Sequence, residues 1–140
     1  GNHPAVGKYI VDVEGIAKNA VPSMELPPAM EEDNMDDIVQ EETTGGTDVV
    51  IIDEVGKMEL FCPSFLPAVE KVLAFRGKRK LLVLGTIPVP RYGRTIEAVE
   101  QIRSRSDVTV LHVTKQNRDA LGKEFQRLAI ANIEYNSSIN

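Results

Sequence analysis

The chain has 140 residues, which is enough for one hydrophobic core but not for two. Its composition, 42% hydrophobic and 26% charged, is that of a soluble globular protein, and no apolar run approaches the roughly 18 residues that a membrane helix needs. A single cysteine, Cys62, excludes an internal disulfide framework. We therefore expect one domain, without a membrane span, in the cytoplasm or another reducing intracellular compartment.

The net charge of −5 is unevenly distributed along the chain. Residues 19–56 contain eleven acids and no lysine or arginine, whereas residues 57–140 contain fourteen bases and eight acids. The second half is therefore suited to an anionic ligand. Because the chain has no tryptophan and no repeats that mix aromatic and basic residues, we do not expect it to bind nucleic acid.

The first predicted elements are a short strand over residues 9–13 and a short helix over residues 14–21, which Pro22 helps to end. Residues 22–47 follow with three prolines and eight acids. This segment has too little apolar surface to offset the entropy of ordering it. We interpret it as an acidic, mobile insertion loop.

The next elements alternate between strands and helices. Four aliphatic residues, Val49 to Ile52, predict a buried strand over 48–55, and an apolar stripe at helical spacing follows Ser64, the predicted N-cap. A second aliphatic strand over 81–84, a helix over 95–103, a strand over 108–113 and a helix after Thr114 complete the chain. This order indicates an α/β protein with a parallel sheet covered on both faces, in which ligands bind beyond the carboxyl ends of the strands.

The first of these strands runs directly into two carboxylates, Asp53 and Glu54. An aliphatic strand that ends in Asp-Glu has the form of a Walker B strand, in which Asp53 holds Mg²⁺ and Glu54 polarises the attacking water. The same pair also occurs by chance at the ends of structural strands, so both interpretations remain open at this point.

A Walker B strand works with a glycine-rich phosphate loop, GxxxxGK[ST]. The four Gly-Lys pairs of the chain are followed by Tyr9, Met58, Arg79 and Glu124, and none has a glycine five positions earlier. The sequence therefore contains no phosphate loop.

Further segments make the pattern specific. IDEVGKMELF (52–61), LGTIPVP (84–90) and VTKQNRD (113–119), in this order and together with VGKYIVDVEG (6–15), resemble the cancer-related nucleoside-triphosphatase family, whose relatives occur in thermophiles. The resemblance covers nearly the whole chain except about residues 23–47. It implies a P-loop NTPase fold (RecA-like, Asp-Glu Walker B division). It also implies Mg²⁺-dependent hydrolysis of several nucleoside triphosphates, with Asp53 as metal ligand and Glu54 as base.

The family's Walker A loop lies in a segment that would precede Gly1. We therefore expect residues 1–140 to form a partial NTPase domain, incomplete at its N-terminus, that does not hydrolyse nucleotides without the missing phosphate-loop segment. In the family fold the strand of that segment lies between the strands at 81–84 and 108–113. Without it we expect those two strands either to have unpaired edges or to be forced together, and the chain either to be marginally stable or to self-associate through its exposed strand edges.

The remaining candidates each have two interpretations. Lys57 either lies near the phosphates or pairs with Glu54 or Glu59, and Thr86 either contacts the γ-phosphate or satisfies a loop amide. Arg91 or Arg94 either stabilises phosphate charge or belongs to a solvated basic loop.

Asn117 and Arg118, where the family places base contacts, either bind the nucleotide or form the first turn of a helix. For the chain as a whole, the alternative to an NTPase part is a non-catalytic folded or partner-binding module.

Overall fold

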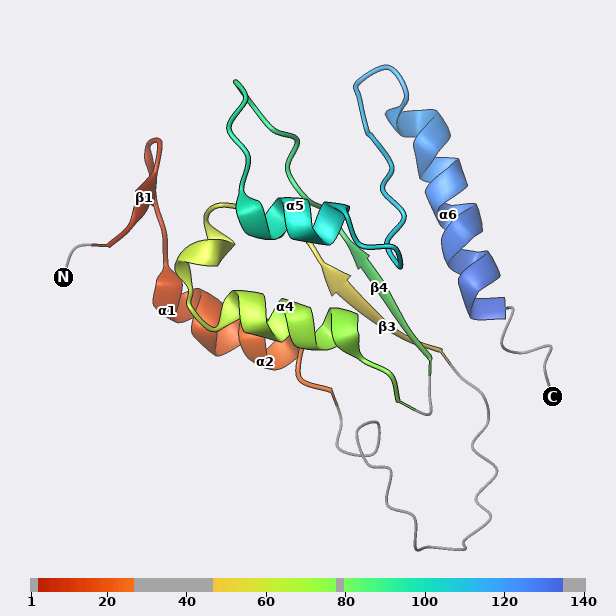
Figure 1. Ribbon diagram of the computed structural model, residues 1–140, viewed down its shortest axis with the longest axis horizontal. Helices are drawn as coiled ribbons and strands as arrows, with labels where there is room; N and C mark the ends of the chain where they lie inside the picture. The colour runs from red at the N-terminus through yellow and green to blue at the C-terminus, as the bar shows by residue number, and fades with distance from the viewer. Residues whose placement is uncertain (1–2, 27–46, 78–79, 135–140) are drawn as a thin grey trace, which may run out of the picture.

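The structure is a computed structural model in which residues 3–26, 47–77 and 80–134 are described (Figure 1). The elements are, in chain order, β1 (Ala5–Val6), β2 (Tyr9–Ile10), α1 (Val13–Gly15), η1 (Ile16–Ala20), α2 (Val21–Ser23), β3 (Thr47–Ile52), η2 (Glu59–Phe61), α4 (Phe65–Ala74), β4 (Lys80–Gly85), α5 (Glu97–Arg103) and α6 (Arg118–Glu134).

The central feature is a parallel pair of strands, β3 and β4. Their register runs from Thr47 opposite Lys80 to Ile52 opposite Gly85. Helix α4 connects the two strands, so the unit β3–α4–β4 is a parallel crossover. This confirms the prediction of an α/β protein with a parallel sheet.

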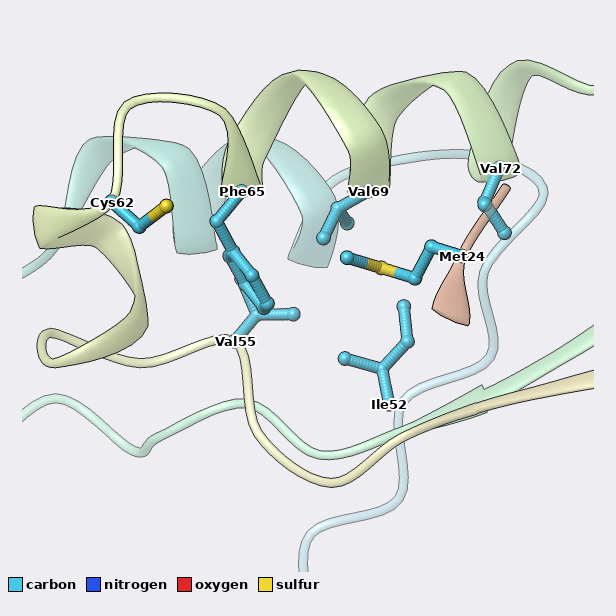
Figure 2. Packing of buried hydrophobic residues seen from close by; sticks show 7 residues of the cluster. All are labelled: Met24, Ile52, Val55, Cys62, Phe65, Val69 and Val72. Atoms are coloured by element: carbon cyan, nitrogen blue, oxygen red, sulfur yellow. The ribbon is translucent and has the colours of Figure 1, made fainter. Parts of the chain in front are cut away.

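The core lies between β3 and α4. Ile52 is buried, and the stripe of α4 contributes Phe65, Val69 and Val72, which are 1–3% exposed. Figure 2 shows these side chains facing one another, with Val55, Cys62 and Met24 completing the cluster. The 3.6-residue period of α4 meets one face of β3 here, and burial of these apolar groups stabilises the contact.

The other face of β3 is open within the described part of the chain. Ile51, one residue before the buried Ile52, is 75% exposed, and Val49 is 41% exposed. Successive side chains of a strand point to opposite faces, so this face of the sheet presents aliphatic groups to solvent. The prediction that helices cover both faces is wrong for the described residues at this point.

The N-terminal segment differs from the predicted strand over residues 9–13. β1 and β2 form a small antiparallel hairpin, with Gly7 at φ +61° in its turn. Val11 is buried. The carboxylate of Asp12 accepts a hydrogen bond of 2.9 Å from the amide of Gly15, and this bond caps the start of α1. The strand therefore ends at Ile10, because Asp12 caps a helix instead of continuing the ladder.

The predicted acidic loop over residues 22–47 also begins later than expected. Val21–Ser23 continue the helical segment, Met24 and Leu26 are buried, and β3 begins at Thr47. The acidic part, 27–46, lies outside the described residues, and its mobility stays a prediction.

Residues 108–113 do not form the predicted strand. Among the described residues, no backbone hydrogen bond joins this segment to β4, and Val110 and Val113 are exposed. A strand is defined by a hydrogen-bonded neighbour, and within the described ranges β4 pairs only with β3. The prediction of a strand over 108–113 is therefore wrong for the described part of the chain, because the aliphatic pattern there has no ladder partner.

A charged cluster anchors the chain just before this segment. Asp107 accepts hydrogen bonds from Arg105 (2.7 Å) and Arg76 (3.0 Å), and Arg105 also donates to the carbonyl of Leu73 (3.0 Å). The bond from Arg105, helped by that from Arg76, lowers the pKa of Asp107 to about 2. The cluster ties the end of α4 to the turn after α5.

No helix in the described ranges has the length and apolar character to cross a membrane.

Candidate active site

Asp53 and Glu54 lie in a bulge at the carboxyl end of the parallel strands. The amide of Thr86 donates to the carbonyl of Ile52 (3.2 Å), and the carbonyl of Thr86 accepts from the amide of Val55 (2.9 Å). A regular parallel ladder places one residue between those two partners, whereas here there are two. The extra residue breaks the strict alternation of side chains, and both carboxylates are exposed.

Thr86 holds this bulge from the β4 side. Besides its two backbone bonds, its hydroxyl donates a hydrogen bond to the carbonyl of Asp53. Gly85 permits the close approach, because a Cβ at that position would lie 3.0 Å from the carbonyl oxygen of Ile52. The hydroxyl proton of Thr86 is therefore engaged with the Asp53 backbone. This contact is to a backbone carbonyl and not to a loop amide, and the contact of Thr86 with the γ-phosphate stays a prediction.

A tight turn follows Glu54. Glu59 accepts a hydrogen bond of 3.1 Å from the amide of Gly56, and the amide of Leu60 donates to the carbonyl of Gly56 (3.1 Å). A Cβ on Gly56 would lie 2.7 Å from Oε1 of Glu54 and 3.0 Å from Oε2 of Glu59. The two carboxylates therefore flank Gly56. Sequence reasoning considered Glu59 only as a partner for Lys57, although its position three residues after Gly56 is that of a capping glutamate.

Lys57 lies in the same turn and is exposed. None of the ion pairs between described residues includes Lys57, so the structure does not display the ion-pair interpretation with Glu54 or Glu59. A contact of Lys57 with phosphate stays a prediction.

Arg91 and Arg94 flank a tight turn in the connection from β4 to α5. They form an antiparallel bridge, with the amide of Arg94 donating to the carbonyl of Arg91 (3.0 Å). Tyr92 and Gly93 between them have φ of +54° and +69°, which is the geometry of a type I′ turn. Both arginines and Tyr92 are exposed. In Figure 1 this connection extends past the end of the sheet at which β3 and β4 terminate.

Asn117 belongs to the turn before α6. Its Oδ1 accepts from the amide of Thr114 (2.7 Å), its amide donates to Oγ1 of Thr114 (3.2 Å), and its Nδ2 donates to the carbonyl of His112 (3.0 Å). These reciprocal bonds are those of a helix-capping residue. The structure thus shows Asn117 at the start of a helix, and its contact with a nucleotide stays a prediction.

Arg118 is the first residue of α6. Its side chain is 70% exposed, and its Nε lies 3.6 Å from Oδ1 of Asp119. In Figure 1 the loop that leads to it extends in the same direction as the connection between β4 and α5. The structure thus brings Asp53, Glu54 and Thr86 together, while Arg91, Arg94 and Asn117 lie on loops and Arg118 begins α6.

Comparison with known proteins identifies the family to which the chain belongs. A family described as NTPase matches residues 1–125. The cancer-related nucleoside-triphosphatase homolog of Bos taurus is 41% identical over 116 residues, which cover 83% of this chain and 53% of the relative. The nucleoside-triphosphatase THEP1 of Thermofilum pendens is 37% identical over 127 residues, covering 91% of this chain and 58% of the relative.

A solved structure agrees with these sequence matches. The solution structure of a human cancer-related nucleoside triphosphatase is similar with a TM-score of 0.64 and 35% identity, over 91% of this chain and 59% of that protein. The chain thus spans just over half the length of these relatives. With the family match covering most of its residues, the chain belongs to the NTPase family of the cancer-related and THEP1 nucleoside-triphosphatases.

Proposed function

We propose that this chain carries the Walker B and nucleotide-facing part of a Mg²⁺-dependent nucleoside triphosphatase that hydrolyses NTP to NDP and phosphate. The observation that carries the proposal is the bulge that presents Asp53 and Glu54 together at the carboxyl end of a parallel strand pair. This is the edge at which α/β proteins bind ligands. The family membership supports the same reaction.

The donor set suits Mg²⁺. The described ranges contain no group of three or more His, Cys, Asp or Glu that could hold a metal ion. Mg²⁺ in nucleotide sites characteristically takes one or two carboxylates together with water and substrate phosphates. Asp53 would hold it, and the ion would neutralise charge on the β- and γ-phosphates when bound.

Glu54 is the proposed base. It is adjacent to the metal ligand and exposed, so a water molecule can approach its carboxylate. It would accept a hydrogen bond from the attacking water and take up its proton. Thr86 would serve the nucleotide by fixing the backbone of Asp53.

The cations around the site would hold the anionic substrate. Lys57 lies three residues after Glu54, and Arg91 and Arg94 lie on the exposed turn after β4. We propose that Lys57 contacts phosphate and that one of the two arginines stabilises charge in the transition state. Asn117 and Arg118 would border the base, with Arg118 stacking on it.

The proposal requires a phosphate cradle that this sequence does not supply. We expect calorimetry with Mg-ATP to show weak or no binding by the 140-residue chain, and binding with phosphate release once a GxxxxGK[ST] strand–helix segment is added. A chain given that segment that still fails to hydrolyse Mg-nucleotide would remove the main support. Tight binding by the 140-residue chain alone would contradict the need for the cradle.

A second candidate function is a partner-binding module that self-associates. It is favoured by the exposed aliphatic face of β3 and by β4, which has no second strand neighbour among the described residues. Ile51 and Ile10 are both 75% exposed, so they form a matched pair for a test. Light scattering should show association that Ile51→Lys weakens and Ile10→Lys leaves unchanged, and a monodisperse monomer would argue against it.

The proposed compartment is a reducing one. Its support is the single thiol, Cys62, which is buried at 2% exposure and has Sγ 3.3 Å from Oγ of Ser64.

Ser64 occupies the N-cap position of α4 as expected, but its side chain makes no capping bond there.

A further inference from the structure

The turn that follows the carboxylate pair contains a third carboxylate, Glu59, whose role is not accounted for by metal binding or proton transfer. Glu59 is half-buried, and its Oε2 accepts a hydrogen bond of 3.1 Å from the buried amide of Gly56. Two residues before Gly56 lies Glu54, the proposed base. The bond therefore closes the turn over residues 56–59, which directly follows Glu54 and Val55.

Glu59 is itself attached to the core. The amide of Cys62 donates to its carbonyl (3.0 Å), and Cys62 is among the most deeply buried residues of the described chain. Leu60, the next residue, packs against the core cluster. Glu59 thus projects from a fixed one-turn element, η2, onto the backbone beside Glu54. Side chains held in this way can orient a reactive group.

The steric arrangement at Gly56 supports a direct relation between the two glutamates. A carbon atom added to Gly56 would approach Oε1 of Glu54 to 2.7 Å and Oε2 of Glu59 to 3.0 Å. Both carboxylates therefore lie within 3.0 Å of the same point beside Gly56. If Glu59 no longer accepted the hydrogen bond from the amide of Gly56, the turn beside Glu54 would lose that constraint.

We propose that Glu59 is a positioning residue that holds the proposed base, Glu54, in its reactive orientation through the amide of Gly56. The inference rests on the proposed function. Glu59 touches neither substrate nor metal in this account and acts only through the turn. This role requires the length of the Glu59 side chain and an acceptor oxygen at its end, but it does not require the negative charge.

Two substitutions separate reach from charge. Glu59→Asp keeps the charge but shortens the side chain by one carbon, so the bond to Gly56 is lost. Glu59→Gln keeps the length and an acceptor oxygen. Glu70, exposed on α4, supplies the matched controls Glu70→Asp and Glu70→Gln.

The kinetic test uses the chain with its phosphate-binding segment present. We expect Glu59→Asp to lower kcat about 10- to 100-fold with KM changed by less than about 3-fold, since a misplacement of about 1 Å is enough for a 100-fold loss. Glu59→Gln and both Glu70 variants should stay within about 3-fold of the unmodified chain. A kcat of Glu59→Asp within about 2-fold, or an equal loss in Glu59→Gln, would overturn the proposal.

A second measurement does not depend on hydrolysis. In amide hydrogen exchange on the 140-residue chain, the protection of Gly56 should fall in Glu59→Asp and persist in Glu59→Gln and the Glu70 variants. Unchanged protection in Glu59→Asp would overturn the proposed contact even if no nucleotide is hydrolysed. Absence of hydrolysis in every variant, with protection lost in Glu59→Asp as expected, would instead overturn the proposed function and leave the contact established.

Discussion

Replacing Gly56 with alanine tests how closely the turn constrains the proposed base. The backbone of Gly56 lies outside the left-handed region, so alanine can adopt it without backbone strain. The new methyl group would lie 2.7 Å from Oε1 and 2.9 Å from Cδ of Glu54, and 3.0 Å from Oε2 of Glu59. Ordinary contacts begin at about 3.5 Å, so the Glu54 carboxylate must withdraw by about 0.6–0.8 Å.

The expected effect on stability is small. The displaced atoms are the ends of flexible side chains, and Gly→Ala stabilises by about 0.4–1 kcal/mol through the unfolded state, which offsets much of the strain. The effect on catalysis should be large, because a displacement of about 1 Å costs up to about 100-fold in rate. We therefore expect kcat to fall about 10- to 100-fold with the urea midpoint nearly unchanged.

Two other glycines provide controls for this experiment. A Cβ on Gly122, inside α6, would meet nothing within 4 Å, so Gly122→Ala should stabilise the chain by about 0.5–1 kcal/mol and leave kcat unchanged. A Cβ on Gly85 would press on the backbone carbonyl of Ile52, so Gly85→Ala should destabilise by about 1–3 kcal/mol. If Gly56→Ala keeps kcat within about 2-fold, the inferred constraint on Glu54 is refuted.

Three further predictions concern the framework of the site. The pKa of Asp107 is lowered from 3.8 to about 2 by Arg105, so its ion pairs stabilise the fold above pH 3.8 and are lost as the pH falls through about 2. The difference in unfolding free energy between the chain and Asp107→Asn should therefore shrink over that range in urea titrations, and a difference that persists undiminished at pH 2 would contradict this assignment. Asn117→Ala should destabilise by about 1 kcal/mol and reduce exchange protection at the start of α6, because the bonds to Thr114 and His112 are lost. A change in nucleotide affinity without that loss of protection would indicate a direct base contact instead. Val69→Ala removes two buried methyl groups from a side chain that is 1% exposed, and should lower the unfolding free energy by about 2 kcal/mol; a change below about 0.5 kcal/mol would show that the core relaxes around the site.

The strands and helices that have both a strong pattern and a local partner were predictable from the sequence. β3 and β4 are aliphatic runs joined by a helix with a regular apolar stripe, and each finds its partner within the described chain. Residues 108–113 have a similar aliphatic pattern but no ladder partner there. Hydrophobicity indicates that a segment can be buried, whereas a strand also needs a neighbour with free backbone groups.

The site was predictable in its residue types and only partly in its geometry. The sequence placed Asp53 and Glu54 after a buried strand, but the bulge opposite Thr86 depends on hydrogen bonds between segments 33 residues apart. The hydrogen bond from the Gly56 amide to Glu59 had a local signal, the position of Glu59 three residues after Gly56, and was missed because Glu59 was considered only as a charge partner. Asn117 was ambiguous because a capping amide and a ligand amide have the same sequence context.

The central claim is that Glu54 is the base of a nucleotide-hydrolysing site. Its most direct test is Glu54→Gln in the chain with its phosphate-binding segment, with phosphate release and Mg-ATP affinity measured on the same samples. The account predicts that turnover falls to background while the dissociation constant for Mg-ATP stays within about 3-fold. Unchanged turnover in Glu54→Gln would contradict it.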